Sequence, residues 1–341
     1  MKVTTGRARL IGAVAALAFM GAAVTGCGSS SSSESGSEPA ASTAAAASAA
    51  PSVEPVAGST VGASMINMRD PDLVVMGNAM QQAADASGDA LVLLDTKGDV
   101  ATELQLIEDM ITRQPAAIIM QALDGTASQS AAKAINDAGI PLFTLSTDFA
   151  DGNTLKVESY IGVDDTEAGK LQAAYANGQL PDGGTIAYLV GTYGASWTDR
   201  RLAGFMEDKN ANIEIAVESQ ANGSRDEGKR VMEDILQRFP AGELNGLVCH
   251  NDEMCIGAAS AIKEAGREGD FKFVIGVDGT QAGYAAIQDG GMTASVRQDS
   301  AGQGAKAIEV VNQFLAGQAV DPRYFLPFEL VDADNIDQFI E

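Results

Sequence analysis

Hydrophobic and polar positions alternate along this chain in two patterns from Thr60 onward. Short, mostly apolar runs are typical of buried strands, whereas the longer segments between them carry apolar residues three or four positions apart. Leu104, Ile107 and Ile111 have this spacing, which predicts a helix with one buried face. In the first block the predicted strands are 61–65, 90–94, 116–120 and 142–145, and the helices are 73–87, 100–113 and 126–138.

The alternation then begins again in a second block. Its predicted strands are 185–190, 213–218, 246–249, 273–277 and 293–296, and its helices are 167–177, 198–209, 224–239, 253–265 and 282–288. Strict strand–helix alternation predicts parallel sheets covered by helices on both faces. The patterned region spans about 280 residues, a size at which one hydrophobic core usually divides. We therefore expect an α/β fold with two doubly wound parallel-sheet lobes.

Residues 1–26 have the pattern of a cleaved export signal. A basic start precedes an apolar run at 10–20, which is too short to span a bilayer stably. The following Val-Thr-Gly-Cys at 24–27 resembles a bacterial lipobox. That resemblance implies cleavage before Cys27 and lipid on its thiol, and an ordinary secretory signal with an incidental cysteine is the alternative.

The next segment, 27–58, is almost entirely Ser, Ala, Gly, Pro, Thr and Glu. Such a composition cannot bury enough apolar surface to offset its ordering entropy, so we expect a flexible tether. A helix in the alanine-rich 41–50 tract is the alternative. Together the two segments predict an extracytoplasmic protein held by lipid at the outer face of the membrane.

Charge restricts the choice of partners. The chain carries a formal net charge of −24 at pH 7. Nucleic acid and anionic membrane surfaces are therefore poor partners, and membrane contact is expected only through the lipid on Cys27.

Signatures of catalysis are sparse. A His-dependent triad or a metal site with several histidines would have only His250 to use, because the chain contains a single histidine. No phosphate-binding or dinucleotide-binding glycine motif opens a helix. Asp70 and Asp72 could serve as the carboxylate pair of a glycosidase, which is kept as an alternative. We expect no catalytic residues, no cofactor and no metal site.

Cys249 and Cys255 lie near each other in the sequence, at the end of a predicted strand and at the start of the next helix. A disulfide is compatible with an oxidising compartment, but cysteines at such positions often point apart. We expect two buried free thiols.

Ligands of open parallel sheets bind beyond the carboxyl ends of the strands. Most residues just past the predicted strand ends are carboxylates, amides and hydroxyls, together with one indole, which suits a ligand rich in hydroxyl groups. They are Asn67, Asp70, Asp95, Gln121, Ser146, Thr147, Asp148, 193–197, His250, Asn251, Asp252 and Asp278.

Motifs in the second half carry a resemblance to a known family. Asn-Asp-Glu-Met at 251–254 is followed by Gly-Val-Asp-Gly-Thr at 276–280, and Gln298 stands ahead of Gly-Ala-Lys at 304–306. The combination resembles the ribose/galactose-type periplasmic binding proteins, which are type I solute receptors of ABC importers. The first half matches mainly by the order and spacing of its elements.

The resemblance implies two lobes joined by three crossovers, near Val163, Gln298 and Pro327, with a sugar held between them. The implied N-terminal lobe is 59–162 plus 299–326, and the implied C-terminal lobe is 163–298 plus 327–341. A monosaccharide or polyol, and an ABC permease with its ATPase, are the implied partners of a monomeric receptor.

Site residues carry over one by one. Asn251, Asp278 and Gln298 match family positions that bind sugar hydroxyls, and Asp70 matches a sugar-binding amide or aspartate. Capping is the structural alternative for Asn251 and Asp278. The ten predicted ligand-binding residues are Asp70, Asp72, Ser146, Thr147, Asp148, Trp197, Asp199, Asn251, Asp278 and Gln298.

Several of these positions depart from the ribose receptors. Asp72 stands where they carry an aromatic residue, Ser146 and Thr147 replace Asp-Arg, and Asp199 replaces an arginine of the second lobe. The indole of Trp197 suits the C–H face of a pyranose or polyol. We expect structural roles for His250 and for Arg201, the latter in a salt bridge.

Two questions stay open at this level. A sensor of the same fold, presenting a sugar or furanosyl signal to a chemoreceptor or histidine kinase, is the alternative to uptake. The acidic loop residues are compatible with an amino sugar or another cation, and also with a neutral hexose, pentose or inositol.

Overall fold

The computed structural model describes residues 58–150 and 152–340. The predicted export signal, Cys27 and the tether up to residue 57 lie outside these ranges. Within them, no helix is both long and apolar enough to cross a membrane.

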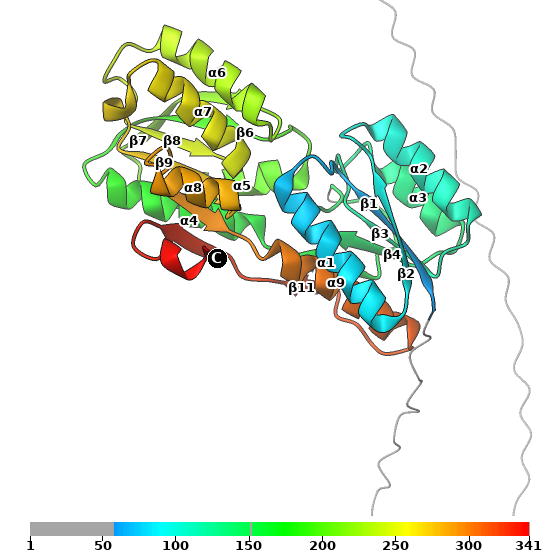
Figure 1. Ribbon diagram of the computed structural model, residues 1–341. Coiled ribbons are helices and arrows are strands. Elements are labelled where there is room, and N and C mark those ends of the chain that lie inside the picture. Colours follow the sequence, from blue (N-terminus) through cyan, green and yellow to red (C-terminus); the bar gives the residue numbers. More distant parts are fainter. Residues whose placement is uncertain (1–57, 151, 341) are drawn as a thin grey trace, which may run out of the picture. The chain divides into compact units, whose positions relative to one another are not determined.

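The first lobe is built on one six-stranded parallel sheet, with the strand order β11-β5-β4-β3-β1-β2. Helices α1 and α9 pack on one face, and α2 and α3 on the other (Figure 1). The strands are β1 (Thr60–Met65), β2 (Ala90–Asp95), β3 (Ala117–Met120), β4 (Leu142–Leu145), β5 (Ser159–Gly162) and β11 (Arg323–Phe325). The helices are α1 (Pro71–Ser87), α2 (Val100–Thr112), α3 (Gln129–Asp137) and α9 (Ser300–Leu315).

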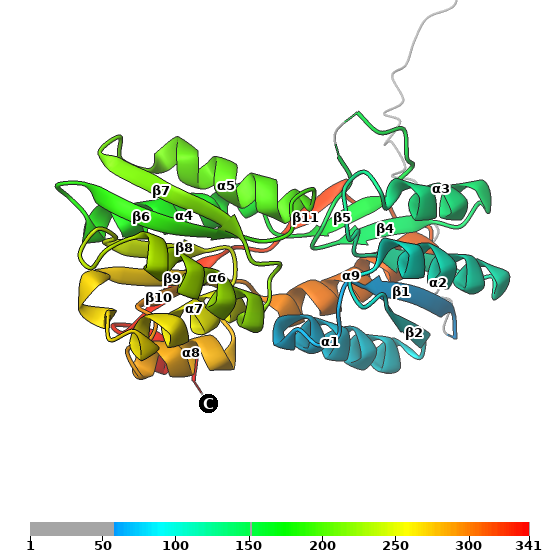
Figure 2. The ribbon, with the colours of Figure 1, turned by 90° about the horizontal axis from the view of Figure 1, so that it is seen from above.

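The second lobe repeats this plan, with the strand order β12-β10-β9-β8-β6-β7. Helices α4 and α5 cover one face, and α6, α7 and α8 the other (Figure 2). The strands are β6 (Gly184–Val190), β7 (Ile213–Gln220), β8 (Gly246–Cys249), β9 (Phe273–Asp278), β10 (Ala294–Arg297) and β12 (Glu329–Asp332). The helices are α4 (Asp165–Gln179), α5 (Ser196–Asp208), α6 (Arg225–Arg238), α7 (Asp252–Glu264) and α8 (Gln281–Gln288), with short 3-10 turns at Glu268–Asp270 and Ile336–Gln338.

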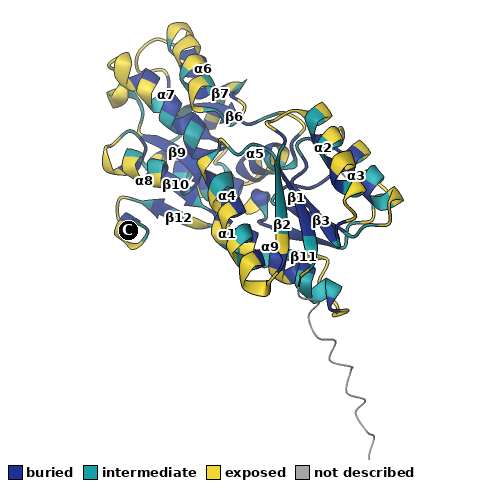
Figure 3. Cartoon of the chain, turned by 45° about the vertical axis from the view of Figure 1, so that its right-hand side comes forward, coloured by how far each residue is buried: buried dark blue, intermediate teal, exposed yellow. Residues whose placement is uncertain are grey.

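The inner strands of each sheet are buried on both faces and are mostly dark blue in Figure 3. Ile186, Tyr188 and Val190 of β6 pack with α4 and α5, while the intervening Ala187 and Leu189 pack with α6 and α7. Successive side chains of a strand point to opposite faces, so a strand covered on both sides is apolar throughout. This explains why short apolar runs were the clearest signal in the sequence.

The chain changes sheets three times: between β5 and α4, between β10 and α9, and between β11 and β12. These segments contain Val163, Gln298 and Pro327, where the crossovers were expected. The later crossovers can be followed in Figure 1 along the orange and red parts of the chain. The predicted fold class, with two doubly wound lobes and a three-segment hinge, is confirmed.

Four elements were not predicted: β5, β11, β12 and α9. Strand β12 also runs antiparallel to β10, so the second sheet is not wholly parallel. The outer strands β11 and β12 are short, and only one of their residues, in β12, is buried. They therefore lack the buried apolar runs of the inner strands. Their positions in the sheets depend on the crossovers: the second crossover leads back to the first lobe, where β11 pairs, and the third leads to the second lobe, where β12 pairs.

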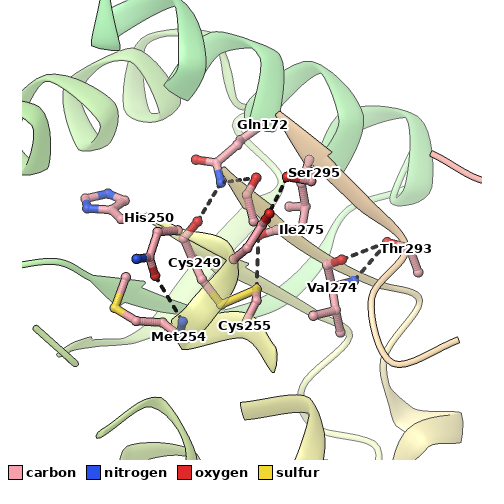
Figure 4. The surroundings of a disulfide bond; sticks show 12 residues. Gln172, Cys249, His250, Met254, Cys255, Val274, Ile275, Thr293 and Ser295 are labelled. Carbon is pink, nitrogen blue, oxygen red and sulfur yellow. Dashed lines mark hydrogen bonds between the residues drawn. A yellow bond between two sulfur atoms is a disulfide. The ribbon is translucent and has the colours of Figure 1, made fainter. Parts of the chain in front are cut away.

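The expectation of free thiols was wrong, because Cys249 and Cys255 form a disulfide (Figure 4). Their Cα atoms are 5.6 Å apart, within the range that a disulfide bridges. The chain turns sharply from β8 into α7 through an extended Asn251, and this turn brings the two side chains together. The bridge therefore encloses the loop that carries Asn251.

The disulfide predicts a defined alkylation pattern. When the exported chain is unfolded in iodoacetamide without reductant, peptide mass spectrometry should find Cys249 and Cys255 linked and unmodified. Prior reduction should make both alkylatable. Alkylation of both residues without reductant would contradict the bridge.

Helices α4 and α5 approach each other through glycines. A Cβ atom built at Gly169 would lie 2.0 Å from the carbonyl oxygen of Arg201, and one at Gly204 would lie 2.0 Å from that of Thr166. Neither backbone can yield without separating the helices. This contact fixes the position of Arg201, which matters for the site below.

Replacing Gly169 by alanine should therefore lower the free energy of unfolding by about 1–3 kcal/mol through overpacking. Gly178 of the same helix is the matched control, because a Cβ atom built there would meet nothing within 4 Å and its backbone is helical. Gly178→Ala should raise the free energy of unfolding by about 0.5–1 kcal/mol. Urea denaturation measures both, and equal effects of the two substitutions would refute the close contact.

Candidate functional site

A cleft lies where the carboxyl ends of the strands of both lobes face each other. It is lined by Ile66, Asn67, Asp70, Asp72, Leu73, Gln121, Leu123, Ser146, Thr147, Thr192, Ala195, Trp197, Arg201, Asn222, Gly223, Asn251, Asp278 and Gln298. Its volume is about 130 Å³. This is far more space than a single water needs, so the cleft has room for one small molecule.

The strand order explains this position. In both sheets the chain first adds strands on one side of the starting strand and then on the other, which leaves a crevice at the switch point. In the first sheet the switch lies between β1 and β3, where Ile66 and Gln121 follow the strand ends. In the second it lies between β6 and β8, where Thr192 and Asn251 follow the strand ends.

Eight of the ten predicted ligand-binding residues line the cleft: Asp70, Asp72, Ser146, Thr147, Trp197, Asn251, Asp278 and Gln298. Asp148 and Asp199 do not. The side chain of Asp199 is exposed on α5, and that of Asp148 is paired with Arg323 at 2.7 Å. We leave these two residues out of the proposed site.

Asp70 and Asp72 occupy the start of α1. Asp70 is the N-cap and accepts a hydrogen bond from the backbone N–H of Asp72 at 3.0 Å. Asp72 is buried, and its Oδ1 accepts from the hydroxyl of Ser300 at 2.6 Å. Burial raises the pKa of Asp72 to about 7, although the hydrogen bond from Ser300 lowers it. Burial also raises the pKa of Asp70.

Gln298 connects the two lobes at the base of the cleft. Its Nε2 donates to Asp278 Oδ1 at 2.8 Å and to Asp72 Oδ2 at 3.2 Å. Its Oε1 accepts from Gln303 Nε2 at 3.0 Å. One amide thus uses both of its hydrogens on carboxylates that belong to different lobes.

Asp278 is held in a strained backbone conformation, with φ of 118°. Such values cost a non-glycine residue on the order of 1–3 kcal/mol and tend to occur at functional sites. Burial raises the pKa of Asp278 well above its usual range; the charge of Asp72 adds to the shift and Arg201 opposes it. The alternative role of Asp278, capping the following turn, is not observed, because the N–H groups of Gly279 and Thr280 donate to Ser295 and Asp252.

Arg201 has the predicted salt bridge and also lines the cleft. Its Nε donates to Asp165 Oδ1 at 2.8 Å, and its Nη1 donates to the carbonyl oxygen of His250. Nη1 also lies 4.0 Å from Asp278 Oδ1. A guanidinium that is hydrogen-bonded to buried partners is held rigidly. Its remaining N–H groups therefore have a fixed direction toward a ligand.

His250 has the structural role that was expected. Its Nδ1 accepts from the N–H of Gly191 at 3.2 Å, and its Nε2 lies 3.1 Å from the hydroxyl of Tyr188. Burial lowers the pKa of His250 well below its usual value, and the charge of Arg201 contributes. The ring is therefore neutral at physiological pH. Its two hydrogen bonds hold His250 in place, and with it the carbonyl oxygen that accepts from Arg201.

Trp197 forms one wall of the cleft. Its ring packs over Gly191, where a Cβ atom would lie 1.8 Å from the indole. The guanidinium carbon of Arg201 lies 5.1 Å from the ring centroid, and His250 meets the ring edge-on at 6.0 Å. The indole is thus held by Gly191, Arg201 and His250 and also lines the cleft.

Asn251 has both the capping role and a place in the cleft. Its Oδ1 accepts from the N–H of Met254 at 2.9 Å as the N-cap of α7, and its Nδ2 donates to the carbonyl of Gly223 at 3.1 Å. An amide nitrogen carries two hydrogens, so the second is available to a ligand.

The lobes touch across the mouth of the cleft. The N–H of Gly125 donates to the carbonyl of Gly194 at 3.0 Å, and the N–H of Asp148 donates to Ser196 Oγ at 3.0 Å. Asp148 Oδ2 also lies 3.9 Å from Arg200. Asp148 therefore belongs to the contact between the lobes and not to the lining.

Sequence reasoning missed the lining role of Arg201, Thr192 and Asn222. Thr192 follows a strand end, so the strand-end rule could have found it. Asn222 and the predicted Ser146 have positive φ values of 53° and 62°, a backbone signal that the sequence does not display.

No group of three or more His, Cys, Asp or Glu residues in the described ranges is arranged to hold a metal ion.

Comparisons with known proteins agree with this architecture. The periplasmic binding protein domain matches residues 61–319. The ribose import binding protein RbsB of Bacillus subtilis is 29% identical, over 80% of this chain and 86% of that protein. RbsB of Escherichia coli is 30% identical, over 81% of this chain and 91% of that protein.

A solved ABC transporter solute binding protein from Bacillus halodurans, with bound myo-inositol, superposes with a TM-score of 0.77. It is 29% identical, and the match covers 83% of this chain and 97% of that one. These relatives are binding proteins and not enzymes, so the glycosidase alternative is dropped. The chain belongs to the periplasmic binding protein family, as a type I sugar-binding protein.

Proposed function

We propose that this chain is the lipid-anchored, extracytoplasmic receptor of an ABC importer, which captures a monosaccharide or polyol and delivers it to the permease. The observation that carries the proposal is the polar cleft between two lobes that also touch each other across its mouth. The names of relatives, which include ribose and myo-inositol binders, support a small polyhydroxylated ligand.

Transport would depend on closure of the lobes. A ligand that contacts both lobes stabilises the state in which they touch. A permease that binds this closed state more tightly than the open one would thereby distinguish loaded from empty receptor. Gly125 with Gly194, and Asp148 with Ser196, supply contacts that exist only when the lobes meet. No bond is made or broken in the ligand.

Each polar group of the lining suits a ligand hydroxyl. Carboxylates such as Asp278 accept from hydroxyls, the Asn251 amide donates, and Arg201 donates from a fixed edge. The indole of Trp197 suits the C–H side of a ring. Asp72 in place of an aromatic residue favours a ligand other than ribose in its usual pose.

Truncation of the central polar residues should weaken binding. Asp278→Ala and Asn251→Ala should each raise Kd about ten- to a hundredfold, because each removes a buried hydrogen-bonding group worth about 1.5–3 kcal/mol. Isothermal titration with the ligand found in a thermal-shift screen of sugars and polyols measures the effect.

Asp199→Ala is the matched control, since it removes an exposed carboxylate of α5 outside the lining. Its Kd should stay within about twofold of that of the parent. The melting temperature of each variant separates loss of binding from loss of fold, which is needed for Asn251 because it caps α7. Unchanged affinity in both Asp278→Ala and Asn251→Ala would reject the assigned site.

The anchor predicts a change of cell fraction. Cys27→Ser removes the thiol that would carry the lipid, so the exported protein should move from the membrane fraction to the soluble extracytoplasmic fraction. Fractionation followed by immunoblotting measures this. An equal membrane share for the parent and the variant would reject the lipid anchor and leave the receptor function untouched.

A further inference from the structure

The charged residues of the cleft are unevenly distributed between the lobes. The lining contains the carboxyl groups of Asp70, Asp72 and Asp278 and the guanidinium of Arg201. Both charged lining residues of the first lobe, Asp70 and Asp72, are acids. Arg201 comes from the second lobe, so the first-lobe wall has no cation of its own within the described lining.

The charge of Arg201 is already shared. Its shortest ion pair is with Asp165, a fully buried residue outside the lining, and its Nη1 donates to His250. Only the 4.0 Å approach to Asp278 is directed at a cleft carboxylate. One guanidinium therefore faces four buried or half-buried carboxyl groups, and carboxylates without a counter-charge are costly to bury.

The cleft also holds polar groups that await a partner. Thr147 is 3% exposed, and its hydroxyl oxygen has no hydrogen-bond partner among the described residues. Asp278 is 5% exposed and uses only Oδ1, which leaves Oδ2 without a hydrogen bond from the described part of the chain. Both residues line the cleft, so a ligand is the available partner.

We propose that the cleft is specific for a sugar or cyclitol bearing a protonated amine, with the ammonium group bound on the first-lobe wall by Asp70 and Asp72. This inference rests on the proposed function and names its substrate class. An ammonium has three N–H donors and no acceptor, so it complements a wall made of carboxylate oxygens. The hydroxyls of the same ligand would face Asn251, Asp278 and Thr147.

A neutral polyol satisfies the hydrogen bonds but leaves the charge imbalance in place. In the free protein, burial raises the pKa of Asp72 to about 7, so a proton balances part of this charge. The groups that face Asp72 are Asp70 ahead of α1, Asp252 of α7, Asp278 of β9 and Arg201 of α5. A bound ammonium would replace the proton and lower that pKa.

The linkage has a definite sign. Below pH 7 the ammonium must displace a proton from the cleft, so its affinity should rise from pH 5 to pH 7. Proton release makes the measured binding enthalpy depend on the ionisation enthalpy of the buffer. A neutral polyol should show neither effect to a comparable degree.

The test compares matched ligand pairs by isothermal titration on the full chain at pH 7. The pairs are D-glucose with D-glucosamine, D-galactose with D-galactosamine, and myo-inositol with an aminodeoxyinositol; the N-acetyl amino sugars keep the nitrogen but lack its charge. We expect at least one amine to bind ten times more tightly than both its hydroxyl and its N-acetyl counterparts.

Asp70→Asn is the diagnostic variant, because asparagine keeps the N-cap of α1 and removes only the charge. It should reduce the preference for the amine over its hydroxyl counterpart about tenfold. Asp99→Asn is the matched control, since Asp99 is the N-cap of α2 in the same lobe but lies outside the cleft. It should leave the preference unchanged.

Three results would overturn the inference, and one of them would also overturn the proposed ligand class. If the hydroxyl member binds as tightly as the amine in every pair that shows binding, the charge specificity is wrong and the receptor function stands. If no member of any pair binds to stably folded protein, both proposals are rejected: the small polyhydroxylated ligand and the preference for an amine. A preference that survives Asp70→Asn and Asp72→Asn alike would also place the ammonium elsewhere.

Discussion

The carboxamide of Gln298 is the contact around which the two lobes are organised. It stands in the second crossover and donates one hydrogen to Asp72 of the first lobe and the other to Asp278 of the second. Its own oxygen is fixed by Gln303 of α9. Two buried carboxyl groups would otherwise face each other without a donor between them, which is costly in a medium of low polarity. The hinge and the base of the binding cleft are therefore the same structure.

The second lobe solves a similar problem with a cation. Arg201 is buried because α4 and α5 meet through Gly169 and Gly204, and Asp165 at the start of α4 compensates its charge. The carbonyl oxygen of His250 accepts a second hydrogen bond from Arg201, and the neutral ring of His250 packs edge-on against the indole of Trp197. Close helix packing thus fixes the charged edge and the aromatic wall of the cleft at once. Stability and ligand recognition depend on the same contacts here.

Several strand-end residues that the sequence predicted as ligand-binding lie in the lining of the cleft. Asn251, Asp278 and Gln298 line the cleft, as do Ser146 and Thr147, because parallel strands bring their carboxyl ends to one edge. Asp148 and Asp199 had equally suitable chemistry but lie elsewhere. Asp148 is drawn to Arg323, a residue far away in the sequence, and Asp199 falls on the exposed side of its helix. Side-chain direction depends on partners that the local sequence does not reveal.

The sequence by itself determined the alternation of strands and helices, the two lobes and the polar rim of each sheet, because buried strands and amphipathic helices have periodic patterns that need no partner to be recognised. Only the tertiary structure decided the antiparallel edge strand β12, the disulfide around Asn251 and the double role of Arg201. Each of these depends on the approach of segments that are brought together by the crossovers or by a sharp turn. Such approaches follow from the packing of the whole chain, so local patterns cannot express them.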